Sequence, residues 1–143
     1  MADVLVTPDV VMLVIGHLGD TLPLIAGQAS VPVYKDVPDP RDASFVTVQF
    51  YGGPGRTGQV PVDQTGVIVE AWDDDPEAAQ ILAQNARAVV LAMRGQVIDG
   101  VTVYDVTDGG TPVDLPHDLS AQTRFTFNAG LSIRPARITL SEP

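Results

Sequence analysis

The chain has 143 residues, with 18 acidic and 8 basic side chains, a formal net charge of −10 at pH 7, and no cysteine. This length fits a single domain, 1–143, and the lack of cysteine excludes disulfides, thiolate metal sites and cysteine nucleophiles. The negative charge opposes binding to nucleic acid phosphates, and the longest apolar run near the start, 10–15, is too short to span a bilayer. We therefore expect a soluble, unexported protein with no membrane contact.

The first third of the chain predicts a helix, an extended edge segment and a strand. Thr7 can cap a helix over about 8–19, because apolar residues recur there at helical spacing and Pro8 suits the first helical position. Prolines restrict the extended segment 31–37 to a sheet edge or to irregular pairing. Residues 44–51 alternate as a strand with one firmly apolar face and one mixed face.

A glycine-rich segment, 52–58, follows that strand and reads as a mobile connection. Clustered backbone N–H groups in such a loop can cradle an anion, but no phosphate-binding glycine motif is present and the segment joins two strands. Plain solvent exposure and ordering against a neighbouring subunit are equally compatible with the sequence. Arg56 lies near the tip of this segment and is the residue to test. We expect Arg56→Glu to disturb the joining of the subunit to its neighbours in an assembly while leaving the monomer folded.

The second half predicts a strand at 65–72, a long helix over about 76–94, and strands at 101–107 and 124–133. Asp75 should cap the helix through its carboxylate, Pro76 suits its first position and Gly95 should end it. The turn at 108–109 then leads into a C-terminal β-hairpin. The aromatic residues of these strands are expected in the core: Tyr51, Trp72, Phe125 and Phe127.

This element order predicts an α+β fold, with a mostly antiparallel sheet packed by two helices. The last segment, 134–143, is either a frayed tail or an arm that adds to a partner's sheet edge. Three of the eight basic residues, Arg124, Arg134 and Arg137, lie in the last twenty positions, which suits contact with an acidic partner.

The sequence offers no catalytic signature. His17 and His117 lie far apart, no serine sits in a G-x-S-x-G elbow, and we expect neither enzyme activity nor a cofactor. The acidic run at 73–77 matches no metal loop, and negative charge at a helix start is favoured by the helix dipole alone. A small cation- or ligand-binding protein that uses Asp73 and Asp74 is the alternative from a different functional class.

The ordered set of elements forms a pattern that covers most of the chain. Its carriers are Pro8, Val10, Val11, Leu13 and Leu18 in the opening helix, Val33 and Tyr34 before the proline-rich bend, the strand Phe45–Tyr51 with Gly52 and Gly53, the strand Val67–Trp72, the Asp75 and Pro76 helix start with Ala79, Leu82 and Ala86, and Phe125, Phe127 and Leu131 in the hairpin. This pattern resembles the tail terminator proteins of long, non-contractile-tailed bacteriophages. A head-to-tail connector of the same phage neck, a stopper or adaptor, has a similar element order and is the alternative.

The resemblance implies a homohexamer ring that caps the tail tube, ends its polymerisation and offers a docking face for the head. Its implied partners are the major tail tube protein and a head-side connector, with genomic DNA passing through an acidic lumen without specific binding. The implied location is the virion neck, after assembly in the host cytoplasm. The expected subunit or tail-tube contacts are Gly53, Arg56, Gln59, Arg134 and Arg137.

Overall fold

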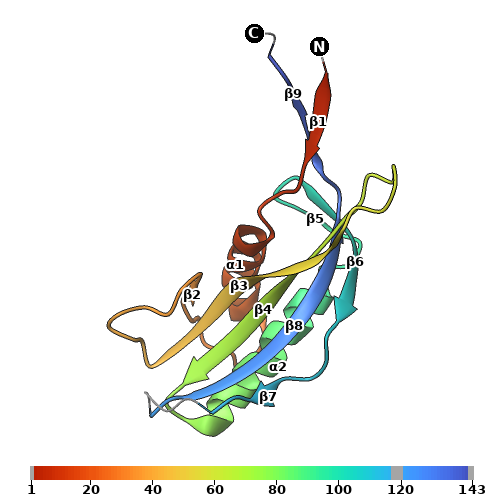
Figure 1. Cartoon of the computed structure of the whole chain (residues 1–143). Helices are drawn as coiled ribbons and strands as arrows, with labels where there is room; N and C mark the ends of the chain where they lie inside the picture. Colours follow the sequence, from red (N-terminus) through yellow and green to blue (C-terminus); the bar gives the residue numbers. More distant parts are fainter. Residues whose placement is uncertain (1, 117–120, 142–143) are drawn as a thin grey trace.

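A main sheet with both helices on one of its faces forms the body of the molecule (Figure 1). The computed structural model describes residues 2–116 and 121–141, and the sheet order is β2-β3-β4-β8-β6-β5, with β7 paired to β8. Every pairing is antiparallel except the short parallel pairing of β2 with β3, so the predicted α+β class is confirmed. The strands are β2 (Val33–Tyr34), β3 (Ser44–Gly55), β4 (Asp63–Asp73), β5 (Val97–Ile98), β6 (Val101–Asp108), β7 (Val113–Asp114) and β8 (Thr123–Ile133).

The first helix, α1, runs over Val10–Thr21 and continues into a short 3-10 helix, η1, at Leu22–Leu24. The predicted cap is wrong, because Asp9 caps the helix by accepting from the Met12 N–H at 3.1 Å. Thr7 instead donates its hydroxyl to Asp63, 2.7 Å away, and so belongs to a tertiary contact.

The second helix, α2, covers Pro76–Leu91 and is shorter than the predicted 76–94. Asp75 holds the N-cap position, but its side chain accepts no capping hydrogen bond. The Asp75 N–H donates to the Asp73 carboxylate at 2.9 Å, so Asp73 organises the turn before the helix. Gly95 lies in the turn after the helix with φ of 76°, in the left-handed region that favours glycine.

The principal core lies between the helices and the sheet. α1 packs on β3, and α2 packs on β4 and β8. Val46 pairs with Ala71 and Val48 with Val69. These side chains lie on one face of β3 and β4 and form a buried apolar layer. The other fully buried contributors include Val14 and Leu18 from α1, Ala83, Ala86 and Val90 from α2, and Met93 after it.

The opposite face of the sheet carries a second, aromatic cluster at one end. Phe45 stacks on Trp72 with ring centroids 5.5 Å apart, and both side chains are buried. The guanidinium groups of Arg41 and Arg124 each lie 5.1 Å from the Trp72 ring centroid. The expected core positions of Trp72 and Phe127 are confirmed, whereas Tyr51 is 52% exposed because neither helix covers its face of the sheet.

A two-stranded antiparallel ribbon of β1 (Asp3–Val6) and β9 (Ala136–Thr139) projects from one end of the body (Figure 1). The segment expected as a tail or arm therefore pairs with the start of its own chain. The expected loop 52–58 is also shorter than predicted, because β3 continues through an irregular stretch to Gly55. A Cβ at Gly53 would lie 2.5 Å from the Gln64 carbonyl oxygen, so glycine is what lets the two strands come together there.

Candidate subunit interface

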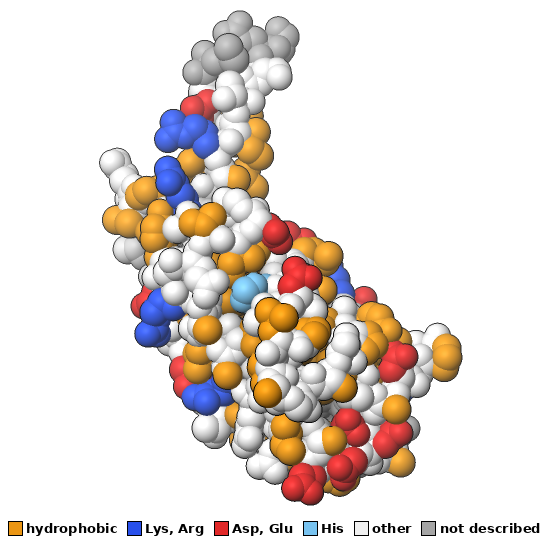
Figure 2. Space-filling model, turned by 180° about the vertical axis from the view of Figure 1, so that it is seen from behind, with side chains coloured by type: hydrophobic (Ala, Val, Ile, Leu, Met, Phe, Trp, Pro, Cys, Tyr) orange, Lys and Arg blue, Asp and Glu red, His pale blue; other side chains and the backbone are white. Residues whose placement is uncertain are grey.

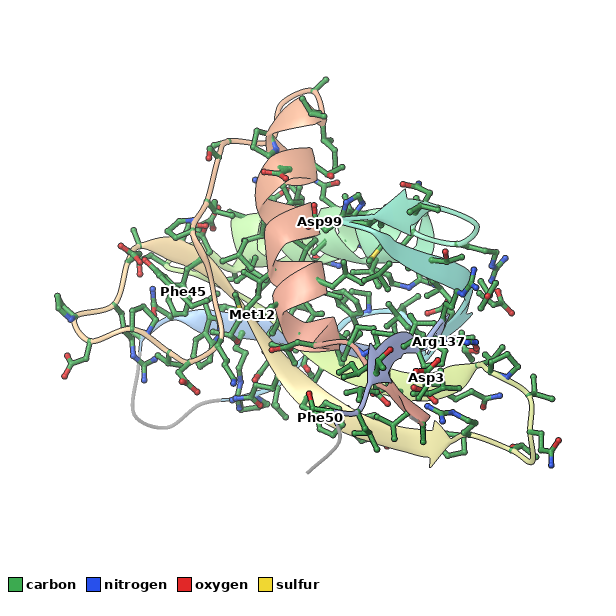
Figure 3. The ribbon with its side chains drawn as sticks, turned by 90° about the horizontal axis from the view of Figure 1, so that it is seen from above. Asp3, Met12, Phe45, Phe50, Asp99 and Arg137 are labelled. Atoms are coloured by element: carbon green, nitrogen blue, oxygen red, sulfur yellow. The ribbon has the colours of Figure 1, made fainter. Side chains whose placement is uncertain are left out.

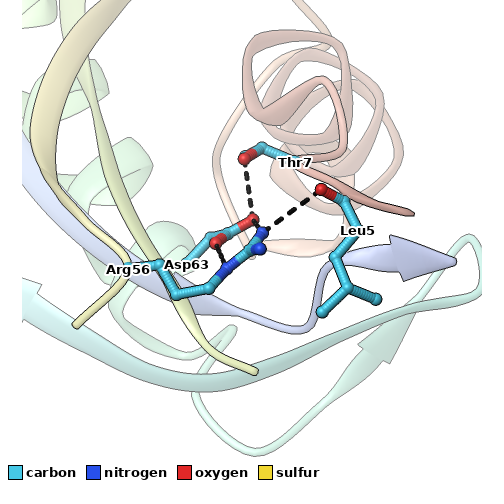
Figure 4. Close-up of polar contacts among 4 residues, drawn as sticks. All are labelled: Leu5, Thr7, Arg56 and Asp63. Carbon is cyan, nitrogen blue, oxygen red and sulfur yellow. Dashed lines mark hydrogen bonds and ion pairs between the residues drawn. The ribbon is translucent and has the colours of Figure 1, made fainter. Parts of the chain in front are cut away.

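Arg56 and Asp63 form an ion pair across the connection between β3 and β4 (Figure 4). Arg56 Nε lies 2.6 Å from Asp63 Oδ1, and Arg56 Nη2 lies 2.9 Å from Oδ2. Thr7 donates its hydroxyl to the same Oδ2, and Arg56 Nη2 also lies 3.5 Å from the Leu5 carbonyl oxygen. Asp63 thus links the β3–β4 connection to the segment that joins the ribbon to α1.

The electrostatics of this pair favour the charged carboxylate. Asp63 is only 3% exposed, and the hydrogen bond from Arg56 holds the pKa of the Asp63 carboxyl below its ordinary value. The same bond raises the pKa of the Arg56 guanidinium. Arg56 therefore does not sit on a free loop tip: its charge is used inside the subunit, while 30% of its side chain stays accessible to a neighbour.

Arg134 and Arg137 line one hollow of about 470 Å³ at the base of the ribbon, together with Leu5, Pro61 and Tyr104. Arg137 Nη1 lies 3.4 Å from Asp3 Oδ2, and its side chain is 72% exposed. Arg134 makes no ion pair with any residue that the structure describes. Two of the sequence-predicted contact residues are thus brought together, with much of their charge available to an acidic group.

The other two predicted residues lie elsewhere on the same end. Gly53 lines a recess of about 500 Å³ beside the start of α1, with Thr7, Pro8 and Phe50. Gln59 is exposed in the connection after β3, and Pro61 of that connection reaches the arginine hollow. Four of the five predicted residues therefore line the two hollows or contact the ribbon.

Sequence reasoning missed the apolar face of the ribbon. In the register of β1 with β9, Val4 lies opposite Ile138, while Arg137 lies opposite Leu5 on the other face. Val4, Val6, Ile138 and Leu140 are each 37–48% exposed. Figure 2 shows hydrophobic side chains on one side of the ribbon and Lys or Arg side chains on the other. Apolar residues recur at every second position in the two short terminal segments, and this alternation is the sequence signal that could have predicted the apolar face.

Two further exposed apolar side chains lie on the body below the ribbon. Phe50 at the end of β3 is 65% exposed, and Met12 on α1 is 54% exposed. Seen from above in Figure 3, Asp3 and Arg137 lie to one side of the ribbon, and Met12 and Phe50 lie to the other. The molecule therefore exposes apolar side chains both on the ribbon and on the body beside it.

The acidic turn supplies no metal site within residues 2–116 and 121–141, where no group of three or more His, Cys, Asp or Glu side chains is placed to hold an ion. His17 is partly buried, and desolvation lowers the pKa of its imidazole. His117 lies outside the described residues. None of the described helices has the length and apolar character needed to cross a membrane.

No protein-family model and no curated protein matches this chain. Solved structures share its fold. A chain from the virion of a native gene transfer agent particle superposes with a TM-score of 0.55 at 13% identity, covering 79% of this chain and 84% of that chain. A second solved chain gives a TM-score of 0.51 at 13% identity, covering 89% of this chain and 92% of its own length. At this identity the likeness establishes the fold.

Proposed function

We propose that the protein is a structural component of a phage-like virion and, within it, the tail terminator: a ring of six copies that caps the tail tube. The observation that carries this is the projecting ribbon, whose apolar face a monomer leaves exposed. An isolated two-stranded ribbon is only marginally stable in water, so such a face is typical of a chain that assembles. The fold shared with a chain of a gene transfer agent virion supports the broader part of this proposal, a structural role in a phage-like particle.

A terminator needs contacts of two kinds, between subunits and with the tube. The ribbon end carries the candidates for both, namely Gly53, Arg56, Gln59, Arg134 and Arg137. In a ring each subunit presents one patch to the next subunit's different patch, and this closure stops open-ended growth. The acidic chain also suits a conduit, since a negative lumen repels the phosphates of passing DNA.

The proposed partners are the major tail tube protein on one face of the ring and a head-side connector on the other. The proposed location is the neck of the virion, reached after assembly in the host cytoplasm. The proposed function is geometric recognition of the tube and of the neighbouring subunits.

Native mass spectrometry of the purified chain over a concentration series tests the ring. A discrete hexamer supports the proposal, and a monomer at every concentration contradicts a ring formed by the free chain. Adding the protein to polymerising tail tubes then separates the terminator from the connector alternative. A terminator fixes tube length, whereas a stopper or adaptor leaves tube growth unchanged.

A further inference from the structure

The two ends of the molecule differ in charge as well as shape. Arg137 belongs to β9 of the ribbon and Arg134 lies just before it, whereas the acidic turn precedes α2. The ribbon and the start of α2 lie at opposite ends of the molecule (Figure 1). Asp73, Asp74 and Asp75 are consecutive there, and Glu77 follows after Pro76; none of the four carboxylates forms an ion pair with a described residue. The two ends are therefore complementary in sign.

The acidic end also has an apolar groove. A hollow of about 370 Å³ lies between the segment 27–31 and the first turns of α2, and Val31, Ala78, Ile81 and Leu82 give it apolar walls. Asp73 lies in its lining, and Ile81 is 50% exposed beside it. The lining also includes Gln28, Ser30 and Ser44, so the groove combines apolar walls with neutral polar groups and one carboxylate, that of Asp73.

The ribbon has the matching combination. Its apolar face consists of Val4, Val6, Ile138 and Leu140, and Arg137 projects from the opposite face of the same two strands. A ribbon lying in the groove with its apolar face inward would remove both apolar surfaces from water. Arg137 would then lie on the outer face of the bound ribbon, where its long side chain could reach a carboxylate beside the groove but not one on its floor. Burial supplies affinity in such a contact, and charge complementarity fixes its orientation.

We propose that the groove between segment 27–31 and α2 receives the β1–β9 ribbon of a second copy of this chain. Ribbon and groove lie at opposite ends of the molecule, so one copy cannot fill its own groove (Figure 1). The contact is heterologous and runs from each copy to the next, and a ring results where the rotation closes. This inference rests on the proposed ring and names the surfaces that build it.

Engineered cysteines test the contact directly, because the natural chain contains none. Ile138→Cys and Ile81→Cys are placed together in one chain, which is oxidised at the concentration where native mass spectrometry finds the ring. We expect a ladder of covalent oligomers ending at the ring size. Each single variant gives no ladder beyond a dimer. The matched control pairs Ile138→Cys with Val97→Cys, whose parent side chain is 68% exposed outside the groove, and it should give no ladder.

Charge reversal adds a second measurement. Arg137→Glu and Glu77→Arg should each raise the concentration needed for assembly by about tenfold, and the two together in one chain should restore it. Lys35→Glu changes the net charge as Arg137→Glu does and should leave assembly unchanged. If the protein forms a ring but the variant with cysteines at 138 and 81 gives no ladder, the proposed contact is wrong and the ring proposal stands. A chain that forms no ring contradicts the ring proposal itself.

Discussion

Arg56 meets Asp63 through two hydrogen bonds, and Asp63 also holds Thr7, so one buried carboxylate ties the β3–β4 connection to the base of the ribbon. This relationship changes what an Arg56 substitution measures. The sequence suggested a loop-tip arginine that could be reversed without harm to the monomer. In the structure the same reversal places a second carboxylate against a buried one.

Arg56→Glu should therefore destabilise the monomer more than the reversal of a fully exposed pair does, because it removes charged hydrogen bonds and leaves the buried Asp63 carboxylate facing a like charge. Urea unfolding followed by circular dichroism measures the change. Arg94→Glu is the matched control, since Arg94 and its partner Asp105 are 61% and 58% exposed. A pair so exposed should contribute less than about 1 kcal/mol. Equal losses for the two variants would contradict a special role for the buried pair.

The Asp63 carboxyl also predicts a pH dependence. The pKa of the Asp63 carboxyl in the folded protein lies below its ordinary value. The ion pair therefore contributes its full stabilisation at pH values above the pKa of an unfolded Asp, about 3.9. That contribution is lost as the pH falls through the lower folded pKa. Wild type should exceed Asp63→Asn in the free energy of unfolding at pH 7, and the difference should shrink below about pH 4. A difference that stays constant from neutral to strongly acidic pH would rule out this pair as its source.

Gly53 and Gly52 are neighbours, but replacing each of them with alanine should have different effects on stability. A Cβ at Gly53 would lie 2.5 Å from the Gln64 carbonyl oxygen and 2.9 Å from the Thr65 Cα, both backbone atoms of the paired strand. At Gly52 the nearest atom is Phe50 Cε1 at 3.9 Å, an ordinary contact. Gly53→Ala should cost about 1–3 kcal/mol by forcing the strands apart, and Gly52→Ala should be neutral or slightly stabilising. Thermal unfolding of both variants checks the order, and similar melting temperatures would argue against the close approach.

The elements that local patterns encode could be predicted from the sequence. The alternation at 44–51, the proline at the start of α2 and the helical spacing at 10–18 are each contained in a short window, and all three elements form. The ribbon could not be predicted in the same way. β1 has only four residues, and its partner lies at the other end of the chain, so neither strand is strong without the other.

The candidate interface likewise contains residues that the sequence singles out and residues that only the fold identifies. Arg134 and Arg137 stand out in a mostly acidic sequence, and the fold brings them to one hollow. The partner of Arg56 does not stand out, because 18 acidic residues are available and only the β3–β4 pairing selects Asp63. Phe50 belongs by alternation to the buried face with Val46 and Val48, yet it is 65% exposed. How far the helices cover a strand is a property of the whole fold.

Phe45 and Phe50 on the same strand therefore give a last pair of opposite predictions. Phe45 is fully buried and stacks on Trp72, so Phe45→Ala removes that contact and leaves a cavity, and it should cost about 3–5 kcal/mol. Phe50→Ala should change monomer stability by less than about 0.5 kcal/mol, because most of that ring already faces water. Trp72 is the single tryptophan of the chain, so its fluorescence follows unfolding at the aromatic cluster itself. Comparable destabilisation by both substitutions would mean that Phe50 is packed within the monomer, and its availability as contact surface would then be lost.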